Sequence, residues 1–340
     1  MPEILLVAAV CAMVMTLAFV WMLRPVRRGE TLLRALLAGA GATSVAVSVG
    51  GATRAETVEF LLAASFAVAP LSVVVGATAQ VVSPKSRGLP WALVGVWSLI
   101  VYPACVIVPP LVFEMCHASE CRVQDFGGGL ALLVSAAAAV VLARQTTTDA
   151  APTGWAQLAM PVLGVWAAAV VWLASLEGVV DAYTPRILLA AVVAPIGGAI
   201  AWVVVDVLHG AAQHPLRSAA DGVLAGIIAI VPGAASVSFP WSLMVGALAG
   251  AAGAIVFRLQ PLASTGRVVR WALVVLTTAA IGYLAPAVVG DSLGFMFSGR
   301  ITAVVPPALA FLAVVAVGVL ATGPIWARGG SMSRVDSPRR

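Results

Sequence analysis

Apolar runs of about the length of a membrane-spanning helix recur along the whole chain. About 20 consecutive apolar residues are needed to cross the hydrocarbon core of a bilayer as an α-helix. Hydrophobic residues make up 61% of the 340 residues, and Asp, Glu, Lys and Arg together make up 10%. Soluble domains carry about 25% charged residues, so this composition excludes a soluble globular enzyme, and the low charge also excludes a disordered chain. We predict an all-α polytopic membrane protein embedded in the lipid bilayer.

Charged residues, prolines and glycines divide these runs into about eleven predicted spans: Ile4 to Leu23, Leu32 to Gly50, Val58 to Val82, Leu89 to Pro109, Phe126 to Ala143, Ala156 to Leu176, Ile187 to Leu208, Gly222 to Ser236, Trp241 to Phe257, Val268 to Val289, and Ile301 to Thr322. Residues Ser236 to Pro240 are predicted to form the turn between the eighth and ninth spans. The transmembrane domain then covers residues 1–322. A short cytoplasmic tail covers residues 323–340 and is expected to be disordered from Gly329 onward.

The basic residues predict the orientation in the membrane. A cytoplasmic C-terminus places fifteen of the nineteen Lys and Arg residues inside, and leaves Arg54, Arg122, Arg186 and Arg300 outside. An odd number of spans then puts the N-terminus outside. Basic anchors beside anionic lipid also account for the net charge of +5, so nucleic-acid binding is not predicted. We expect a multi-pass protein of the cell (plasma) membrane.

Few residues carry the chemistry of an enzyme or a metal site. Cys116 and Cys121 share a predicted outer loop with His117, at a spacing that could close a small disulfide on the oxidising side. A metal site would need a fourth ligand, so none is predicted there. No nucleophile with a base and no intramembrane pair of carboxylates can be assembled. We therefore predict a protein that is not an enzyme and that holds no cofactor.

Glycines and Asp125 have structural interpretations. Glycines at small-residue spacing, such as Gly222 with Gly226 and Gly246 with Gly250, let membrane helices approach closely. A phosphate-binding role for Gly127 to Gly129 lacks the following Lys-Ser/Thr. An N-terminal helix cap by Asp125 is the preferred interpretation of that segment.

Several segments, in the expected order, resemble the ammonium transporter (Amt/Mep/Rh) family: Met15 to Phe19, Leu23 to Arg28, Ser65 to Pro70, Gly76 to Ala77, Trp97 to Pro103, Asp125 to Gly129, and Ala220 to Ala235 after the His209 to Pro215 loop. The most specific is Ala220 to Ala235, which is similar to a Gly/Ala-rich run in the family's eighth helix. The resemblance implies a homotrimer of eleven-helix protomers. Each protomer would be an inverted five-helix repeat around its own narrow pore.

The same resemblance assigns the candidate transport path. Phe66 matches one of two gate phenylalanines, and the helix-six motif keeps Trp172 but has Ser175 in place of the second. Asp125 matches an aspartate that supports the outer pore mouth. The outer tryptophan of the family falls at about Pro109.

Both pore histidines of the family are missing from this chain. Leu133 stands eight residues after Asp125, where the first belongs, and the span from Val268 to Val289 contains no histidine. His117, His209 and His214 all fall in predicted loops. Two hypotheses follow. The protein is either a channel for ammonia, ammonium or another small neutral solute, or a non-conducting relative with a sensing or interaction role.

Overall fold

The computed structural model describes residues 2–23, 27–50, 65–84, 86–115, 125–143, 155–210, 214–259, 266–290 and 294–335. The regular structure in these ranges is helical: α1 (Pro2–Leu23), α2 (Arg28–Gly50), α4 (Val68–Val82), α5 (Gly88–Val96), η1 (Trp97–Val101), α6 (Tyr102–Met115), η2 (Leu130–Val134), α7 (Ser135–Val140), α8 (Trp155–Ser175), α9 (Thr184–Leu208), α10 (Pro215–Ile230), α11 (Phe239–Arg258), α12 (Arg267–Val289), α13 (Phe295–Ser298), η4 (Ile301–Val304) and α14 (Val305–Val335). The segments η1 and η2 are π-helical, and η4 is a 3₁₀-helix.

Seven helical stretches of the described residues are long and apolar enough to cross a membrane: Leu5–Leu23, Gly88–Pro109, Leu158–Ser175, Thr184–Leu208, Phe239–Arg258, Arg267–Val289 and Ile301–Ala327. The segments Val68–Val82 and Leu130–Val140 are shorter apolar helices. The prediction of an all-helical fold with several membrane-spanning helices is therefore confirmed. The count of eleven spans stays a prediction.

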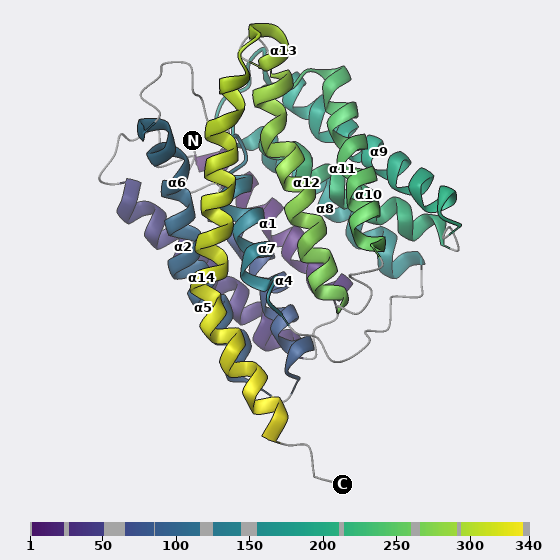
Figure 1. Cartoon of the computed structure of the whole chain (residues 1–340). Helices are drawn as coiled ribbons and strands as arrows, with labels where there is room; N and C mark the ends of the chain where they lie inside the picture. The colour runs from purple at the N-terminus through teal and green to yellow at the C-terminus, as the bar shows by residue number, and fades with distance from the viewer. Residues whose placement is uncertain are drawn as a thin grey trace.

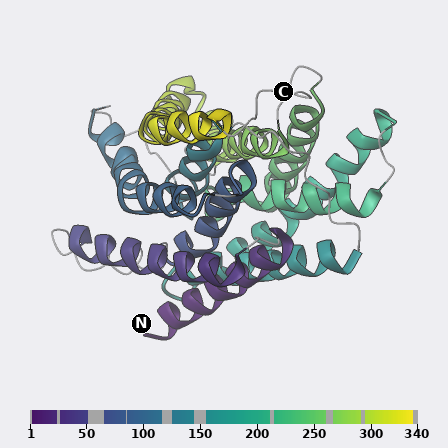
Figure 2. The same cartoon turned by 90° about the horizontal axis from the view of Figure 1, so that it is seen from below.

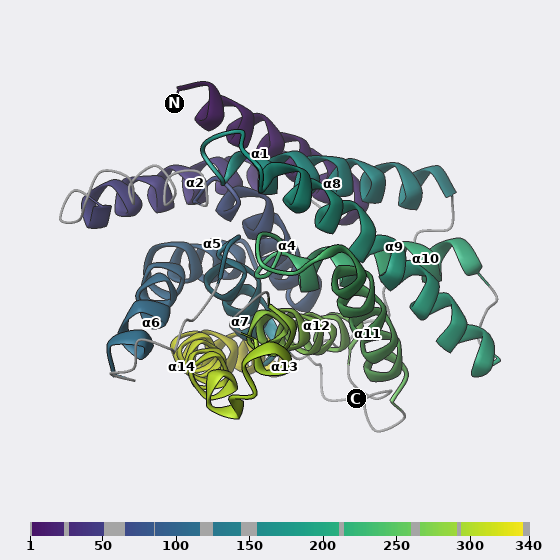
Figure 3. The same cartoon turned by 90° about the horizontal axis from the view of Figure 1, so that it is seen from above.

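Two groups of helices meet along α1 and α8, which pack side by side (Figure 3). In the first group α2 packs on α4, and α4 packs on α1 and α5. In the second group α9 packs on α10 and α11, and α10 also packs on α8 and α12. Seen from below, α1 and α2 lie along one side of the molecule and α14 lies along the opposite side (Figure 2).

Glycines bring the backbones of α9, α10 and α11 into direct contact. A Cβ atom added to Gly222 of α10 would lie 2.4 Å from the carbonyl oxygen of Gly198 in α9, and one added to Gly250 of α11 would lie 2.3 Å from the same oxygen. No side chain fits at either position without separating the helices. The predicted packing role of Gly222 and Gly250 is confirmed.

The last long helix, α14, runs down one face of the molecule past α6, α7 and α12 (Figure 1). It continues through Pro324 to Val335, beyond the predicted end of the last span at Thr322. The prediction of disorder from Gly329 is therefore wrong for residues 329–335. Extending an established helix costs little per residue, whereas starting one is unfavourable, so α14 continues through residues with weak helix preference.

Candidate functional site

Asp125 holds the start of the helix that contains Leu133. Its carboxylate accepts hydrogen bonds from the backbone N–H groups of Gly129 (2.7 Å) and Leu130 (2.9 Å). The intervening Gly128 has a φ of 63°, in the left-handed region that favours glycine. The predicted capping role of Asp125 is confirmed, but the helix begins near Leu130 and not at Phe126.

Phe126 and Gly127, which lie between Asp125 and η2, form backbone hydrogen bonds with the residues that follow α10. The backbone N–H groups of Phe126 and Gly127 donate to the carbonyl oxygens of Pro232 (2.9 Å) and Val231 (3.0 Å). Helix α10 ends at Ile230, and the chain turns over residues 231–236. A Cβ atom on Gly127 would lie 2.4 Å from a methyl carbon of Val231. The Asp125–Gly129 turn thus packs directly against the end of α10.

Burial changes the acidity of Asp125, which lies just before the predicted span. Loss of water raises the pKa of Asp125 to about 6, because the charged form is disfavoured away from water. The hydrogen bonds from Leu130 and Gly129 lower the pKa and offset part of this effect. The carboxylate is therefore mostly ionised at neutral pH.

The other predicted path residues gather in and around one core. Trp172 is buried in that core, and Phe66 and Leu133 are half-buried and pack against it. Phe66 lies in a break just before α4, and Leu133 lies in η2. Ser175 ends α8 and donates its hydroxyl hydrogen bond to the Trp172 carbonyl oxygen (2.7 Å).

Cys116, Cys121 and His117 lie outside the described residues, so the disulfide stays a prediction. Within the described part of the chain, no three His, Cys, Asp or Glu side chains lie close enough to hold a metal ion.

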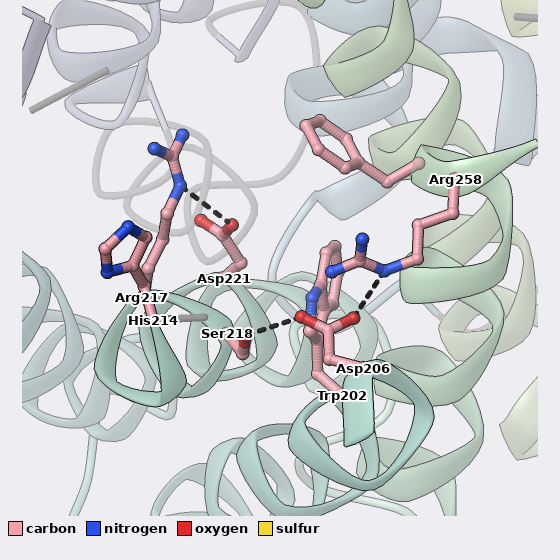
Figure 4. Close-up of a pocket in the computed structure, with 8 residues that line it drawn as sticks. Trp202, Asp206, His214, Arg217, Ser218, Asp221 and Arg258 are labelled. Atoms are coloured by element: carbon pink, nitrogen blue, oxygen red, sulfur yellow. Dashed lines mark hydrogen bonds and ion pairs between the residues drawn. The ribbon is translucent and has the colours of Figure 1, made fainter. Parts of the chain in front are cut away.

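A polar cavity of about 140 Å³ lies at the far end of α9 from Ser175. Figure 4 shows the residues that line it, which come from α9, α10, α11 and the residue before α10: Trp202, Asp206, His214, Arg217, Ser218, Asp221, Phe257 and Arg258. None of the predicted path residues lines this cavity.

Asp206 is the best-partnered charge in the cavity wall. It is 1% exposed, and its two oxygens accept hydrogen bonds from the Arg258 guanidinium (Nε–Oδ1 2.6 Å) and from the Ser218 hydroxyl. Asp221 faces Arg217 at 3.9 Å (Figure 4). Sequence reasoning missed this cluster. The available signal was an aspartate two residues before the end of an apolar span, because ionisable groups in membrane helices are rare.

A second buried charge lies at the start of α2. Arg34 is 2% exposed, donates one hydrogen bond to the Thr31 hydroxyl (2.9 Å) and places its guanidinium 5.5 Å from the centre of the Trp91 ring. The amide of Gln80 also donates to Thr31 (3.2 Å). The Arg34 Nε atom and the Gln80 Oε1 atom have no hydrogen-bond partner among the described residues. The sequence predicted only a cytoplasmic anchor for Arg34.

No protein-family model matches the sequence, and no curated protein sequence matches it either. Solved structures do match. Mep2 from Candida albicans superposes with a TM-score of 0.77 at 14% identity, covering 95% of this chain and 82% of that chain. Mep2 from Saccharomyces cerevisiae gives 0.72 at 13% identity, covering 94% and 86%. A sensor Amt protein gives 0.72 at 13% identity, covering 98% and 93%.

The chain has the Amt/Mep fold. The match covers nearly the whole chain, including the segments that carry Trp172 and Asp206. The predicted likeness to ammonium transporters is confirmed at the level of the Amt/Mep fold.

Proposed function

We propose that this protein is a member of the ammonium transporter family that passes ammonia, or another small neutral solute, through a path in each protomer. The fold match over 95% of the chain is the observation that carries the proposal. The proposal includes eleven spans, an external N-terminus, an inverted five-helix repeat and a homotrimer in the plasma membrane, with residues 1–322 as the transmembrane domain and residues after 322 on the cytoplasmic side.

The proposed path follows Asp125, Phe66, Trp172, Ser175 and Leu133. Its support is the shared core that holds Phe66, Leu133 and Trp172, together with the Asp125 turn next to the end of α10. Apolar walls favour neutral solutes, because stripping water from a cation costs several kcal/mol unless polar partners replace it. We therefore propose that transport is electrically silent.

The test uses the purified full-length protein in liposomes that contain a pH-sensitive dye. An ammonium chloride pulse should raise the internal pH faster than in empty liposomes, because ammonia enters and takes up protons. The same protein on a solid-supported membrane should give no specific ammonium current. Phe66→Glu should abolish the pH response, and the matched control Phe297→Glu, at an exposed residue of α13, should leave it unchanged.

A saturable ammonium current that Phe66→Glu abolishes would contradict the proposal of neutral transport. A wild-type protein with no response above empty liposomes would contradict conduction altogether. That result would favour the second candidate, a non-conducting protein with a sensing or interaction role. The observations on its side are the missing histidine pair and the fold match to a sensor Amt protein.

A further inference from the structure

Tyr283 carries a buried polar group that no described part of the chain supplies with a hydrogen-bond partner. It lies in α12, is 1% exposed, and its hydroxyl has no partner among the described residues. Buried tyrosine hydroxyls normally find a partner, and one that does not calls for an explanation. A ligand that supplies the missing hydrogen bond would be such an explanation.

The position of Tyr283 connects it to the Asp125 turn. Gly233, in the turn after α10, closely approaches the Pro286 ring of α12: an added Cβ would lie 3.1 Å from it. Tyr283 precedes Pro286 by three residues, so it lies on the same face of α12, one turn deeper in the molecule.

Tyr283 and Leu133 lie on two segments that pack together, α12 and η2. Tyr283 and Trp172 belong to the same buried core, and Leu133 and Phe66 pack against it. Leu133 is apolar, so it offers no hydrogen bond to a solute. Tyr283 is the titratable side chain of α12 within this core, and its hydroxyl both donates and accepts hydrogen bonds.

We propose that the Tyr283 hydroxyl is the solute-binding group of the path, and that it selects small neutral amines with one free lone pair, such as ammonia and methylamine. The inference rests on the proposed function, because it names the group that the solute meets on that path. The hydroxyl donates to the nitrogen lone pair of the amine, and its oxygen accepts an amine hydrogen. A neutral hydroxyl cannot replace the hydration of a full cation, so ammonium is excluded.

The test compares wild-type protein with Tyr283→Phe, which removes only the hydroxyl. In the liposome assay with ammonium chloride, Tyr283→Phe should lower the initial rate of internal alkalinisation by about three- to tenfold, the effect of one lost hydrogen bond. The matched control is Tyr183→Phe, since Tyr183 is exposed at 58%. This control should retain the wild-type rate. An unchanged rate in Tyr283→Phe would overturn the inference.

Thermal unfolding separates a solute-binding role from a structural one. Because the hydroxyl has no partner among the described residues, Tyr283→Phe should melt at the wild-type temperature or above it. A melting temperature lowered by several degrees would show that the hydroxyl has a structural partner, and would overturn the inference.

A binding measurement distinguishes failure of this inference from failure of conduction. Methylammonium chloride at mildly alkaline pH should raise the melting temperature of the wild type relative to the same concentration of sodium chloride, and should not do so for Tyr283→Phe. If the wild type conducts nothing yet shows this shift, conduction fails and the Tyr283 site stands. If the wild type shows neither flux nor shift, both fail.

Discussion

Two buried charges, Asp206 and Arg34, lie in the two groups of helices and are stabilised to very different degrees. Asp206 near the end of α9 has partners for both oxygens, while Arg34 near the start of α2 keeps its Nε atom without one among the described residues. The predicted orientation puts both on the cytoplasmic side. A buried charge is tolerated when neighbouring helices complete its hydrogen bonds, and it is costly when they do not. We therefore expect the group of helices that contains α9 to depend on Asp206 for its stability. The group that contains α2 should not depend on Arg34 in this way.

The largest effect is expected from Asp206→Ala. This change removes the charged hydrogen bonds from Arg258 and Ser218, and because the Arg258 side chain is 29% exposed we expect a cost of about 2 kcal/mol. The measurement is the free energy of unfolding in detergent, or the melting temperature where unfolding is irreversible. Ser218→Ala, which removes only a hydroxyl donor, serves as the matched control and should cost about 1 kcal/mol. An Asp206→Ala variant as stable as the wild type would contradict the expected difference between Asp206 and Arg34.

A smaller effect is expected from Arg34→Met. Methionine keeps much of the length of the side chain and needs no hydrogen bonds, so the loss of the Thr31 contact is offset by removal of an incompletely paired charge. The stability should change by about 1 kcal/mol at most, in either direction. The same unfolding assay applies. A loss as large as that of Asp206→Ala would mean that Arg34 is fully partnered in the folded protein.

The smallest effect is expected from Asp221→Asn. Asp221 is 7% exposed and faces Arg217 at 3.9 Å, a longer separation than that of Asp206 and Arg258. Because the Arg217 side chain is 24% exposed, we expect this pair to contribute about 1 kcal/mol or less. The change in melting temperature should be small and should shrink further at high salt, which screens partly exposed pairs. A fall of 2 kcal/mol or more in the free energy of unfolding would mean that Asp221 stabilises the fold as strongly as Asp206.

Several features of the fold could be predicted from local patterns in the sequence. Apolar runs predicted the helices, and the capping preference of aspartate predicted the role of Asp125. The glycine spacing predicted that helices approach closely at these positions, and the structure shows that α10 and α11 do so against α9. These features are local, so the sequence carries them directly.

The candidate sites were less predictable because they depend on contacts between distant segments. The burial of Arg34 depends on α4 and α5, and the pairing of Asp206 with Arg258 joins residues 52 positions apart. In the sequence Tyr283 is an ordinary aromatic residue of an apolar helix, and only the folded chain shows that its hydroxyl has no partner among the described residues. The predicted eighth span runs on to Ser236, whereas α10 ends at Ile230. Pro232 and Gly233 mark this end in the sequence, but the contacts of Val231 and Pro232 with Phe126 and Gly127 join segments that are distant in the sequence.

The π-helical segment η2 changes how positions along this helix should be counted. In an α-helix each residue turns the side-chain direction by about 100°. A π-helical turn closes one residue later, so it turns the chain less for each residue and holds one extra residue per turn. Counting eight residues from Asp125 to Leu133 passes through both the non-helical turn and η2. Residues at equal spacing in the sequence therefore need not point in the same direction around this helix. The side chain that faces the core near Leu133 is set by the three-dimensional structure and not by the number of residues after Asp125.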